Sequence, residues 1–285
     1  MFKIGEFKKR APRRDPLSYK GKNGRVLVIA GSIDFHGAAI FAGWGALNSG
    51  ADLITMVVPE CNFEVTRHFA PDFIVRKYPG EYLTSRAQEL IMTLAKKADV
   101  VIIGPGLGDK PETMRAIKFI VEHLTVPTVL DASAIQVLEL LDKMPLKQPL
   151  VITPHHAEFE KLTGKPFKIN DLADHKVRVI RTLANDLKIN ILLKGPEADI
   201  IAGDEGQIEQ NETGNAGMTV GGSGDVLAGV VAGLIGQGIT PFDACSCAAY
   251  ILGKAGDNLQ KMKGYAYTAS DLAQEIPYIV KEILE

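Results

Sequence analysis

Asp225 stands where a run of glycines gives way to an apolar stretch, in "GGSGDVLAGVVAGLIG". Gly221, Gly222 and Gly224 tolerate positive φ angles, which lets successive backbone N–H groups turn toward one ligand. The apolar stretch predicts a helix, and a helix N-terminus favours negative charge. We therefore expect Gly222, Ser223 and Gly224 to form an anion hole for a transferring phosphoryl group. Asp225 is then the expected catalytic base that accepts a hydroxyl proton, although the helix dipole alone also favours a carboxylate there.

Glycine and polar residues also follow the apolar runs elsewhere in the chain, in "GSIDFHGA", "GPGLG", "DAS", "TPHHAE" and "KG". Ligands of open α/β sheets bind outside the carboxyl ends of the strands, so five such ends predict one site. "GPGLG" (104–108) departs from the dinucleotide fingerprint because Asp109 replaces the last glycine, and no Walker P-loop is present. The segment predicts either a tight strand-to-helix turn or a close backbone approach to a bulky ligand.

The segment "TPHHAEFEKL" offers His155, His156 and Glu158. A metal site needs a third well-placed ligand, and none has suitable spacing, so we expect no protein-held metal here. Thr153 and Pro154 before a helix with acids in its first turn also fit helix capping. We expect His155 to contact the substrate.

The elements that position these residues alternate between strand and helix. Short, continuous apolar runs predict strands buried on both faces at 25–31, 51–59, 99–106, 127–133, 149–155 and 189–195. Helical patterns lie between and after them, at 37–50, 84–98, 111–124, 155–164, 171–188, 224–237, 241–260 and 270–283. After Lys194, "ADIIAGDEGQIEQNET" predicts a hairpin around Gly-Asp-Glu-Gly. The pattern predicts one α/β domain over residues 1–285, with a mostly parallel sheet between helices.

Composition narrows the class of protein. The chain has 285 residues, is 46% hydrophobic and carries a net charge of −2, which gives no overall field for nucleic acid or membrane. The first 25 residues are locally basic, and we expect residues 1–16 to form a solvated extension rather than an RNA-binding arm. Three cysteines make no disulfide framework, which predicts a cytoplasmic protein with Cys245 and Cys247 as buried apolar residues. No apolar stretch is long enough to span a bilayer.

The block "NAGMTVGGSGDVLAGVVAGLIGQG" resembles the signature of the ADP/ATP-dependent NAD(P)H-hydrate dehydratases. "GSIDFHGAAIFAGWGALNSGADLITMVVPE", "GPGLG", "TPHHAEFEKLTG" and "LLKGPEADII" resemble other blocks of that family, in the same order, over residues 17–283. The resemblance implies a ribokinase-like, three-layer α/β/α fold with a short hairpin near the nucleotide site. It implies repair of (6S)-NADHX or NADPHX by dehydration to NADH or NADPH. The dehydration is coupled to hydrolysis of ADP to AMP and phosphate, whereas eukaryotic members use ATP as the nucleotide. Hydroxide leaves poorly, whereas phosphorylation of the hydroxyl would make phosphate the leaving group.

The resemblance also implies roles for individual residues. Those expected to contact the hydrated dinucleotide are Ala38, Ala39, Gly106 or Gly108, His155 and Asp225. Those expected to hold the AMP part of the nucleotide are Lys194, Gly195, Pro196, Glu197, Ala198 and Gly224. Mg²⁺ is expected near the phosphates, held largely by phosphate oxygens and water. Family members tend to form tetramers, so we expect a homo-oligomer. The chain has no room for a fused epimerase domain, so a separate NAD(P)HX epimerase is the expected partner.

Two positions depart from the family pattern. Ser133 replaces the second carboxylate of "LDADAL", which puts a metal- or water-placing role there in doubt, although Asp131 remains. Val220 replaces a threonine, while Ser223 keeps a hydroxyl. Two alternatives share the anion hole: a ribokinase-like kinase of hydroxymethylpyrimidine, hydroxyethylthiazole or a sugar, and a non-catalytic ADP-binding protein. The substrate-side blocks argue against the first, and the intact Asp225 against the second.

Overall fold

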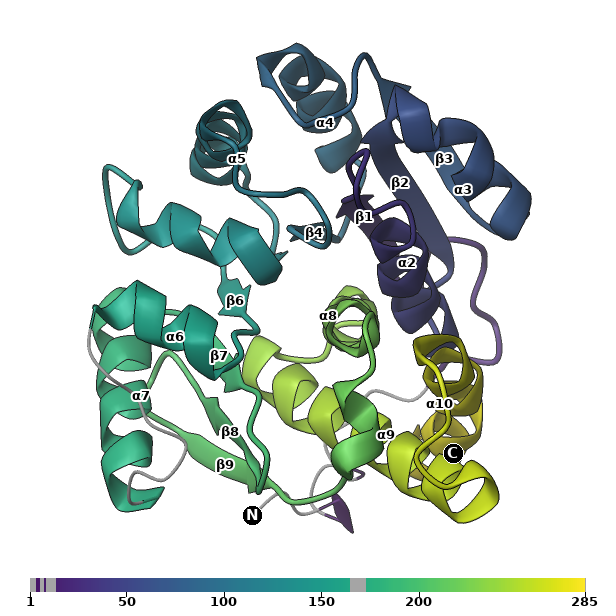
Figure 1. Ribbon diagram of the computed structural model, residues 1–285, viewed down its shortest axis with the longest axis vertical. Helices are drawn as coiled ribbons and strands as arrows, with labels where there is room; N and C mark the ends of the chain where they lie inside the picture. The colour runs from purple at the N-terminus through teal and green to yellow at the C-terminus, as the bar shows by residue number, and fades with distance from the viewer. Residues whose placement is uncertain (1–3, 6–7, 9–13, 165–172, 285) are drawn as a thin grey trace.

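A single nine-stranded sheet forms the centre of the molecule (Figure 1). The computed structural model describes residues 4–5, 8, 14–164 and 173–284. The strand order is β3-β2-β1-β4-β5-β6-β7-β8-β9, parallel from β3 to β7 and antiparallel at β8 and β9. The strands are β1 (Arg25–Ile29), β2 (Leu53–Pro59), β3 (Ile74–Tyr78), β4 (Val100–Ile103), β5 (Thr128–Leu130), β6 (Leu150–Ile152), β7 (Asn190–Leu193), β8 (Asp199–Ala202) and β9 (Ile208–Asn211).

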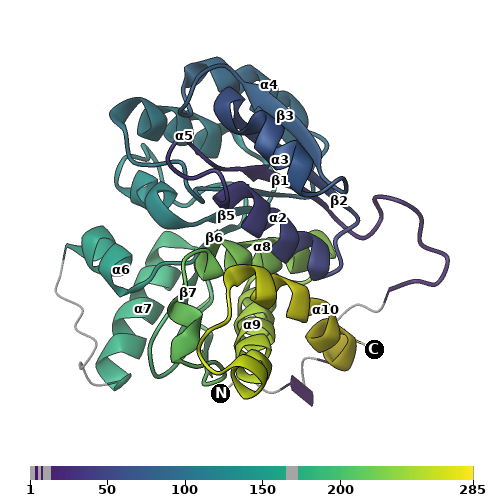
Figure 2. The ribbon, with the colours of Figure 1, turned by 45° about the vertical axis from the view of Figure 1, so that its right-hand side comes forward.

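Helices cover both faces of this sheet, which confirms the expected three-layer α/β fold. One apolar core joins one face of the sheet to α2 (Ala38–Asn48), α8 (Ser223–Gly236), α9 (Pro241–Lys263) and α10 (Ala269–Leu284). The other core joins the opposite face to α4 (Gln88–Ala95), α5 (Pro111–His123), α6 (His156–Thr163) and α7 (Ala173–Leu187). All residues of β4 and β7 are buried because both faces of these strands are covered. Figure 2 shows α9 and α10 beside α2 and α8.

The segment between β2 and α4 contains two elements that the sequence analysis does not predict. They are the short helix α3 (Phe63–Phe69) and the strand β3. Alternation in β3 is weak, since Val75 and Tyr78 are buried but Arg76 and Lys77 are exposed. An edge strand with one partner needs no continuous apolar run, and this explains why periodicity missed it.

The remaining predictions can be checked element by element. The hairpin β8–β9 is confirmed, with its turn between Ala202 and Ile208. Cys245 and Cys247 are buried in α9, as expected. Most of the basic extension 1–16 lies outside the described residues. In the part of the chain that the structure describes, no helix combines the length and apolarity needed to cross a membrane.

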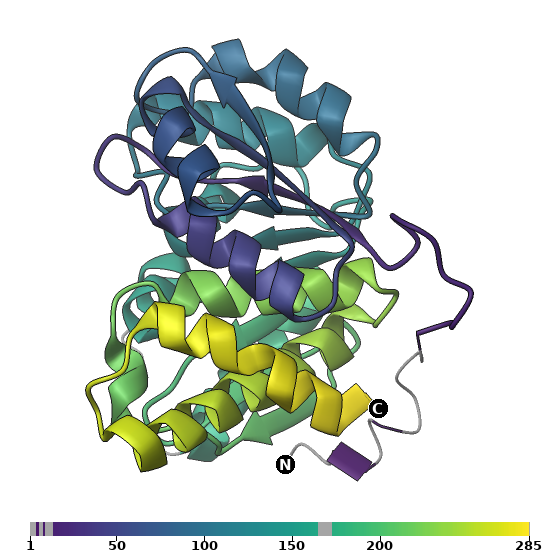
Figure 3. The ribbon, with the colours of Figure 1, turned by 90° about the vertical axis from the view of Figure 1, so that its right-hand side faces the viewer.

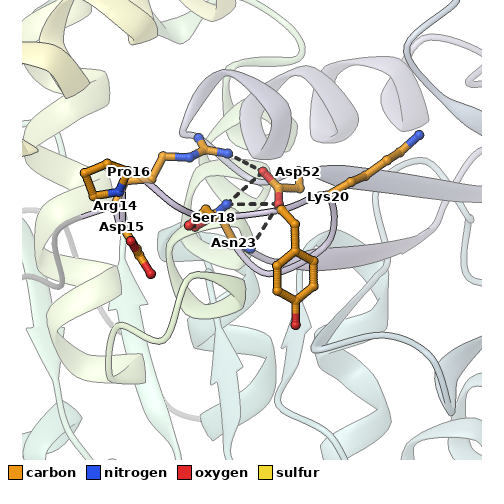
Figure 4. A pocket seen from close by; sticks show the side chains of 8 residues that line it. Arg14, Asp15, Pro16, Ser18, Lys20, Asn23 and Asp52 are labelled. Carbon is orange, nitrogen blue, oxygen red and sulfur yellow. Dashed lines mark hydrogen bonds and ion pairs between the residues drawn. The ribbon is translucent and has the colours of Figure 1, made fainter.

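The amino edge of the sheet is covered by the segment that precedes β1. This segment runs outside the body of the molecule before it enters the sheet (Figure 3). It encloses a shallow hollow in which Asp52, only 9% exposed at its side chain, is the central acceptor (Figure 4). Asp52 accepts hydrogen bonds from the N–H groups of Gly21 at 2.9 Å and Asn23 at 3.0 Å, and pairs with Arg14. Because both oxygens of the Asp52 carboxylate accept hydrogen bonds, Asp52 holds the segment that precedes β1 against the sheet.

Candidate active site

The N-terminus of α8 is open toward the carboxyl edge of the sheet. Gly222 caps the helix with φ +93°, and a Cβ there would lie 2.7 Å from the Phe41 ring, so only glycine fits this turn. No side chain caps the helix. Among the described residues, the N–H groups of Gly224 and Asp225 find no hydrogen-bond acceptor. Two unpaired amides at a helix N-terminus have the geometry that anion binding requires, and the anion hole expected from the glycine run stays a prediction.

Ser223 has a different surrounding from its two neighbours in the expected anion hole. Its N–H donates to the Val220 carbonyl oxygen at 3.3 Å. Its hydroxyl donates to the Met218 carbonyl oxygen at 2.8 Å. Ser223 therefore fixes the glycine loop through its own hydrogen bonds, whereas the N–H groups of Gly224 and Asp225 stay unpaired among the described residues.

A side-chain network holds the loop that leads into α8. The amide oxygen of Asn215 accepts from the Tyr267 hydroxyl at 2.7 Å and from the Gly217 N–H at 3.0 Å. Gly253 of α9 lets the loop approach closely, since a Cβ there would lie 2.1 Å from the Thr213 hydroxyl oxygen. No sequence pattern predicts this network, because Tyr267 and Gly253 are far from the loop in the chain.

Lys194 brings a positive charge to the open end of α8. It follows β7, and its Nζ lies 3.3 Å from where a Cβ on Gly224 would be. The same Nζ lies 3.3 Å from Oδ1 of Asp131, which follows β5 and is 2% exposed. Thr153, after β6, donates to that oxygen at 2.6 Å. Three adjacent strand ends thus position one ammonium group beside the anion-binding amides.

The electrostatics of this cluster suit proton transfer. Asp225 is partly buried, and burial together with the nearby Asp131 charge raises its pKa to about 7, while Lys194 opposes the rise. Burial disfavours the Lys194 charge, but Asp131, then Glu158, and Asp225 more than offset it, so the pKa of Lys194 is raised. Lys194 therefore stays charged, and Asp225 can gain or lose a proton near neutral pH.

The turn at 195–198 joins β7 to the hairpin on the same side as Lys194. The Gly195 N–H donates to Oδ1 of Asp199 at 3.2 Å, and a Cβ on Gly195 would lie 2.3 Å from the Ala198 carbonyl oxygen. Asp199 also accepts from Asn211 of β9 at 3.1 Å. Pro196 and Glu197 are exposed on this tight turn. The structure thus brings Lys194 and Gly224 together and places the predicted nucleotide segment directly after them.

Two of the predicted dinucleotide contacts, Gly106 and Ala38, meet at the loop after β1. The turn "GPGLG" leaves β4, and a Cβ on Gly106 would lie 2.7 Å from the Cβ atoms of Ala38 and Phe35. Ala39 is fully buried, backbone included, so it can shape this part of the molecule only through its packing. Gly108, with φ +76°, faces open space.

The turn "GPGLG" is also fixed to the end of β5. A Cβ on Gly104 would lie 1.8 Å from the Asp131 carbonyl oxygen, so the two strand ends touch through glycine. Ser133, the departure from the family pattern, donates its hydroxyl to the Gly108 carbonyl oxygen at 2.7 Å. This residue supports the loop where the family has a carboxylate.

His155 has a structural role that differs from the expected one, since helix capping was expected at Thr153 and Pro154 but the N-cap is His155. It caps α6: its ring accepts from the Glu158 N–H at 3.3 Å, and the Glu158 carboxylate accepts from the His155 N–H at 2.9 Å. The ring is 55% exposed, and the His155 backbone pairs with that of Lys194. His155 thus lies next to the ammonium-bearing strand end, where it can also meet a substrate.

The mostly parallel sheet, the hairpin and the helices on both faces define a ribokinase-like α/β protein. A ribokinase-like superfamily protein from Enterococcus faecalis is similar, with a TM-score of 0.85 and 28% identity over 99% of this chain and 95% of that chain. A family model described as NAD(P)H-hydrate dehydratase matches residues 26–278. The chain belongs to the NAD(P)H-hydrate dehydratase family.

Two relatives refine this assignment. A protein of Cenarchaeum symbiosum, named ADP-dependent (S)-NAD(P)H-hydrate dehydratase, is 38% identical over 98% of this chain and 96% of its own. A solved structure from Bacillus subtilis, an ADP/ATP-dependent NAD(P)H-hydrate dehydratase co-crystallized with ATP and Mg²⁺, is 26% identical with a TM-score of 0.83, over 99% and 97% of the two chains. The chain spans about half the length of the first curated relatives it matches, which are named bifunctional NAD(P)H-hydrate repair enzymes.

Proposed function

We propose that this chain dehydrates (6S)-NADHX or NADPHX to NADH or NADPH, with ADP or ATP as the co-substrate. The observation that carries the proposal is the cluster at the start of α8, where a carboxyl group with a pKa of about 7 adjoins two unpaired amides and an ammonium group. The name of the Cenarchaeum relative supports the substrate and the nucleotide.

The cluster has the parts that hydroxyl phosphorylation requires. Asp225 accepts the proton of the C6 hydroxyl, and the hydroxyl oxygen bonds to the terminal phosphorus of the nucleotide. The bond between that phosphorus and the leaving AMP (from ADP) or ADP (from ATP) breaks at the same time. The Gly224 and Asp225 amides and Lys194 stabilise the charge on the phosphoryl oxygens. Phosphate then leaves C6 with the bonding electrons, helped by the ring nitrogen. Loss of a proton from the adjacent carbon restores the dihydronicotinamide ring.

The other predicted contacts follow the same division of the site. We assign the hydrated ring and its dinucleotide to the side formed by Ala38, Ala39, Gly106, Gly108 and His155. We assign the AMP part to the turn Lys194–Ala198 and to Gly224. The two groups lie on neighbouring strand ends, which lets the reacting hydroxyl and phosphoryl group meet at Asp225.

Mg²⁺ fits this site as part of the nucleotide complex. Within the described ranges, no three His, Cys, Asp or Glu side chains gather closely enough to hold a metal ion. Mg²⁺ commonly keeps several waters and binds through substrate phosphates, so a full protein cage is not needed. It would neutralise phosphate charge beside Lys194.

We further propose that the chain works as one dehydratase domain in the cytoplasm, as a homo-oligomer, and that a separate epimerase supplies the S-epimer. The fully paired sheet supports the first point. The bifunctional names of the longer relatives support pairing with a second repair activity.

The test is a coupled assay with purified protein, NADHX, Mg²⁺ and either ADP or ATP. We expect NADH absorbance to rise only when a nucleotide is present, with one AMP released per NADH formed from ADP. Phosphorylation of hydroxymethylpyrimidine or hydroxyethylthiazole, without any NADH formation, would replace the dehydratase by a vitamin-precursor kinase.

A further inference from the structure

We infer that Asp131 is a positioning residue, whose buried carboxylate holds the Lys194 ammonium beside the first turn of α8. The inference rests on the proposed function, because Lys194 serves phosphoryl transfer only if a phosphorylated ligand lies at that turn. Asp131 contacts the Lys194 ammonium group and is not itself assigned a contact with the ligand, so it acts on the ligand through Lys194.

The surroundings of Asp131 leave it few other tasks. Its side chain is 3% exposed, and its recorded partners are the Thr153 hydroxyl at 2.6 Å and the Lys194 Nζ at 3.3 Å, both on Oδ1. Its main chain is fixed as well, since Gly104 packs against its carbonyl oxygen. A carboxylate that is held on both its main chain and its side chain has little freedom, so it can fix a flexible lysine.

The lysine needs such a guide because three carboxylates attract its ammonium group. Asp131 lies on one side of Lys194, and the charges of Asp225 and Glu158 also reach it. Pairing with Asp225 would occupy the base, whereas pairing with Asp131 leaves Asp225 free for the substrate. In the structure Lys194 pairs with Asp131, since its Nζ lies 3.3 Å from Oδ1 of Asp131 and close to Gly224.

The sharpest test is a double-mutant cycle of Asp131→Asn and Lys194→Met, with ADP affinity measured by calorimetry. In the wild-type background we expect Lys194→Met to weaken ADP binding about tenfold or more, because an ammonium group is lost from the phosphate site. In the Asp131→Asn background we expect a loss below about threefold, because the released ammonium no longer lies beside the phosphates. An equal loss in both backgrounds would overturn the inference.

A second readout separates positioning from simple structural support. The charges that shift the pKa of Asp225 are those of Asp131 and Lys194, and Glu158 also acts on Lys194. Because the Asp131 charge raises the pKa of Asp225, its removal favours the ionised form of Asp225. Asp131→Asn should therefore lower kcat while moving the acid limb of kcat/KM to lower pH. A merely structural Asp131 predicts a lower melting temperature with kcat per folded enzyme and the acid limb unchanged.

Two features keep the test decisive. Asp131→Asn leaves Lys194 charged without its partner, and where this variant does not fold, Thr153→Val replaces it in the cycle because it removes the donor that orients Asp131. The Lys194→Met penalty should then shrink in the same direction, and an unchanged penalty contradicts the inference. ADP binding needs no dehydration, so coupling in the cycle without NADH formation would sink the proposed function and leave the positioning role intact.

Discussion

Asp52 and Asp131 lie at opposite edges of the same sheet and have opposite effects on their surroundings. At the amino edge, burial works against the Asp52 charge, but hydrogen bonds from Asn23 and Gly21 and the charge of Arg14 hold the pKa of Asp52 below its usual value. At the carboxyl edge, Asp131 pairs with one lysine, and burial of Asp225 together with the nearby Asp131 charge raises the pKa of Asp225 to about 7. At the amino edge, donors of the protein itself stabilise the Asp52 carboxylate. At the carboxyl edge, the amides at the start of α8 are unpaired and the ionised form of Asp225 is disfavoured, and a bound ligand can offset both costs.

The largest expected effect is on kcat, which should fall when an aspartate of the carboxyl edge is replaced and stay unchanged when one of the amino edge is replaced. Asp225→Asn should lower kcat by about 10² or more, because a positioned base contributes that much, while ADP binds with near-normal affinity. Steady-state assays with NADHX, beside calorimetry with ADP, check both halves. The matched control is Asp52→Asn, which should keep wild-type kcat. Equal kcat for Asp225→Asn and the wild type would move the base elsewhere.

The next effect concerns the phosphate site alone. Gly224→Val should weaken ADP binding about tenfold or more, because its side chain would crowd the Lys194 Nζ, 3.3 Å from the Cβ position. Gly224→Ala adds only that Cβ, so its loss of affinity should be smaller. Undiminished ADP affinity in the valine variant would show that phosphate does not bind at this turn.

The amino edge should respond in stability. Asp52→Asn should lower the free energy of unfolding by about 1–3 kcal/mol near neutral pH, because an amide NH₂ would face backbone donors. The lowered pKa of Asp52 means that its contribution is complete above about pH 4 and is lost as pH falls through the folded-state pKa. Urea denaturation should therefore show a difference between variant and wild type that shrinks in acid. A difference that grows in acid would contradict this sign.

The smallest expected effect is a gain in stability at the carboxyl edge. The folded pKa of Asp225 is about 7, so between about pH 4 and 7 the folded state holds a proton that the unfolded chain has lost, and stability falls as pH rises. At about pH 8, Asp225→Asn should be more stable than the wild type by about 1–2 kcal/mol, a figure reduced for partial exposure. The gain should vanish near pH 4. A loss of stability at pH 8 would mean that Asp225 is already paired.

Much of this edge could be predicted from the sequence, because the glycines and polar residues directly follow apolar runs. The helix that begins after the glycine run, the hairpin and the buried parallel strands are confirmed in the fold, whereas the anion site before α8 stays a prediction. The joining of Asp131, Thr153 and Lys194 could not be predicted, since their contacts depend on the order of β5, β6 and β7 in the sheet. The strand β3 was missed because an edge strand is only half apolar.

The central claim is that Asp225 is a base whose pKa is raised by its surroundings, and the pH dependence of wild-type kcat/KM for NADHX tests it most directly. The measurement is made at saturating ADP and Mg²⁺, with an independent check that the enzyme stays folded across the range. We expect kcat/KM to be flat above pH 7 and to fall about tenfold per pH unit below it, with an apparent pKa near 7. A profile that stays flat down to about pH 5 would contradict the account, because Asp225 would then titrate as an ordinary aspartate.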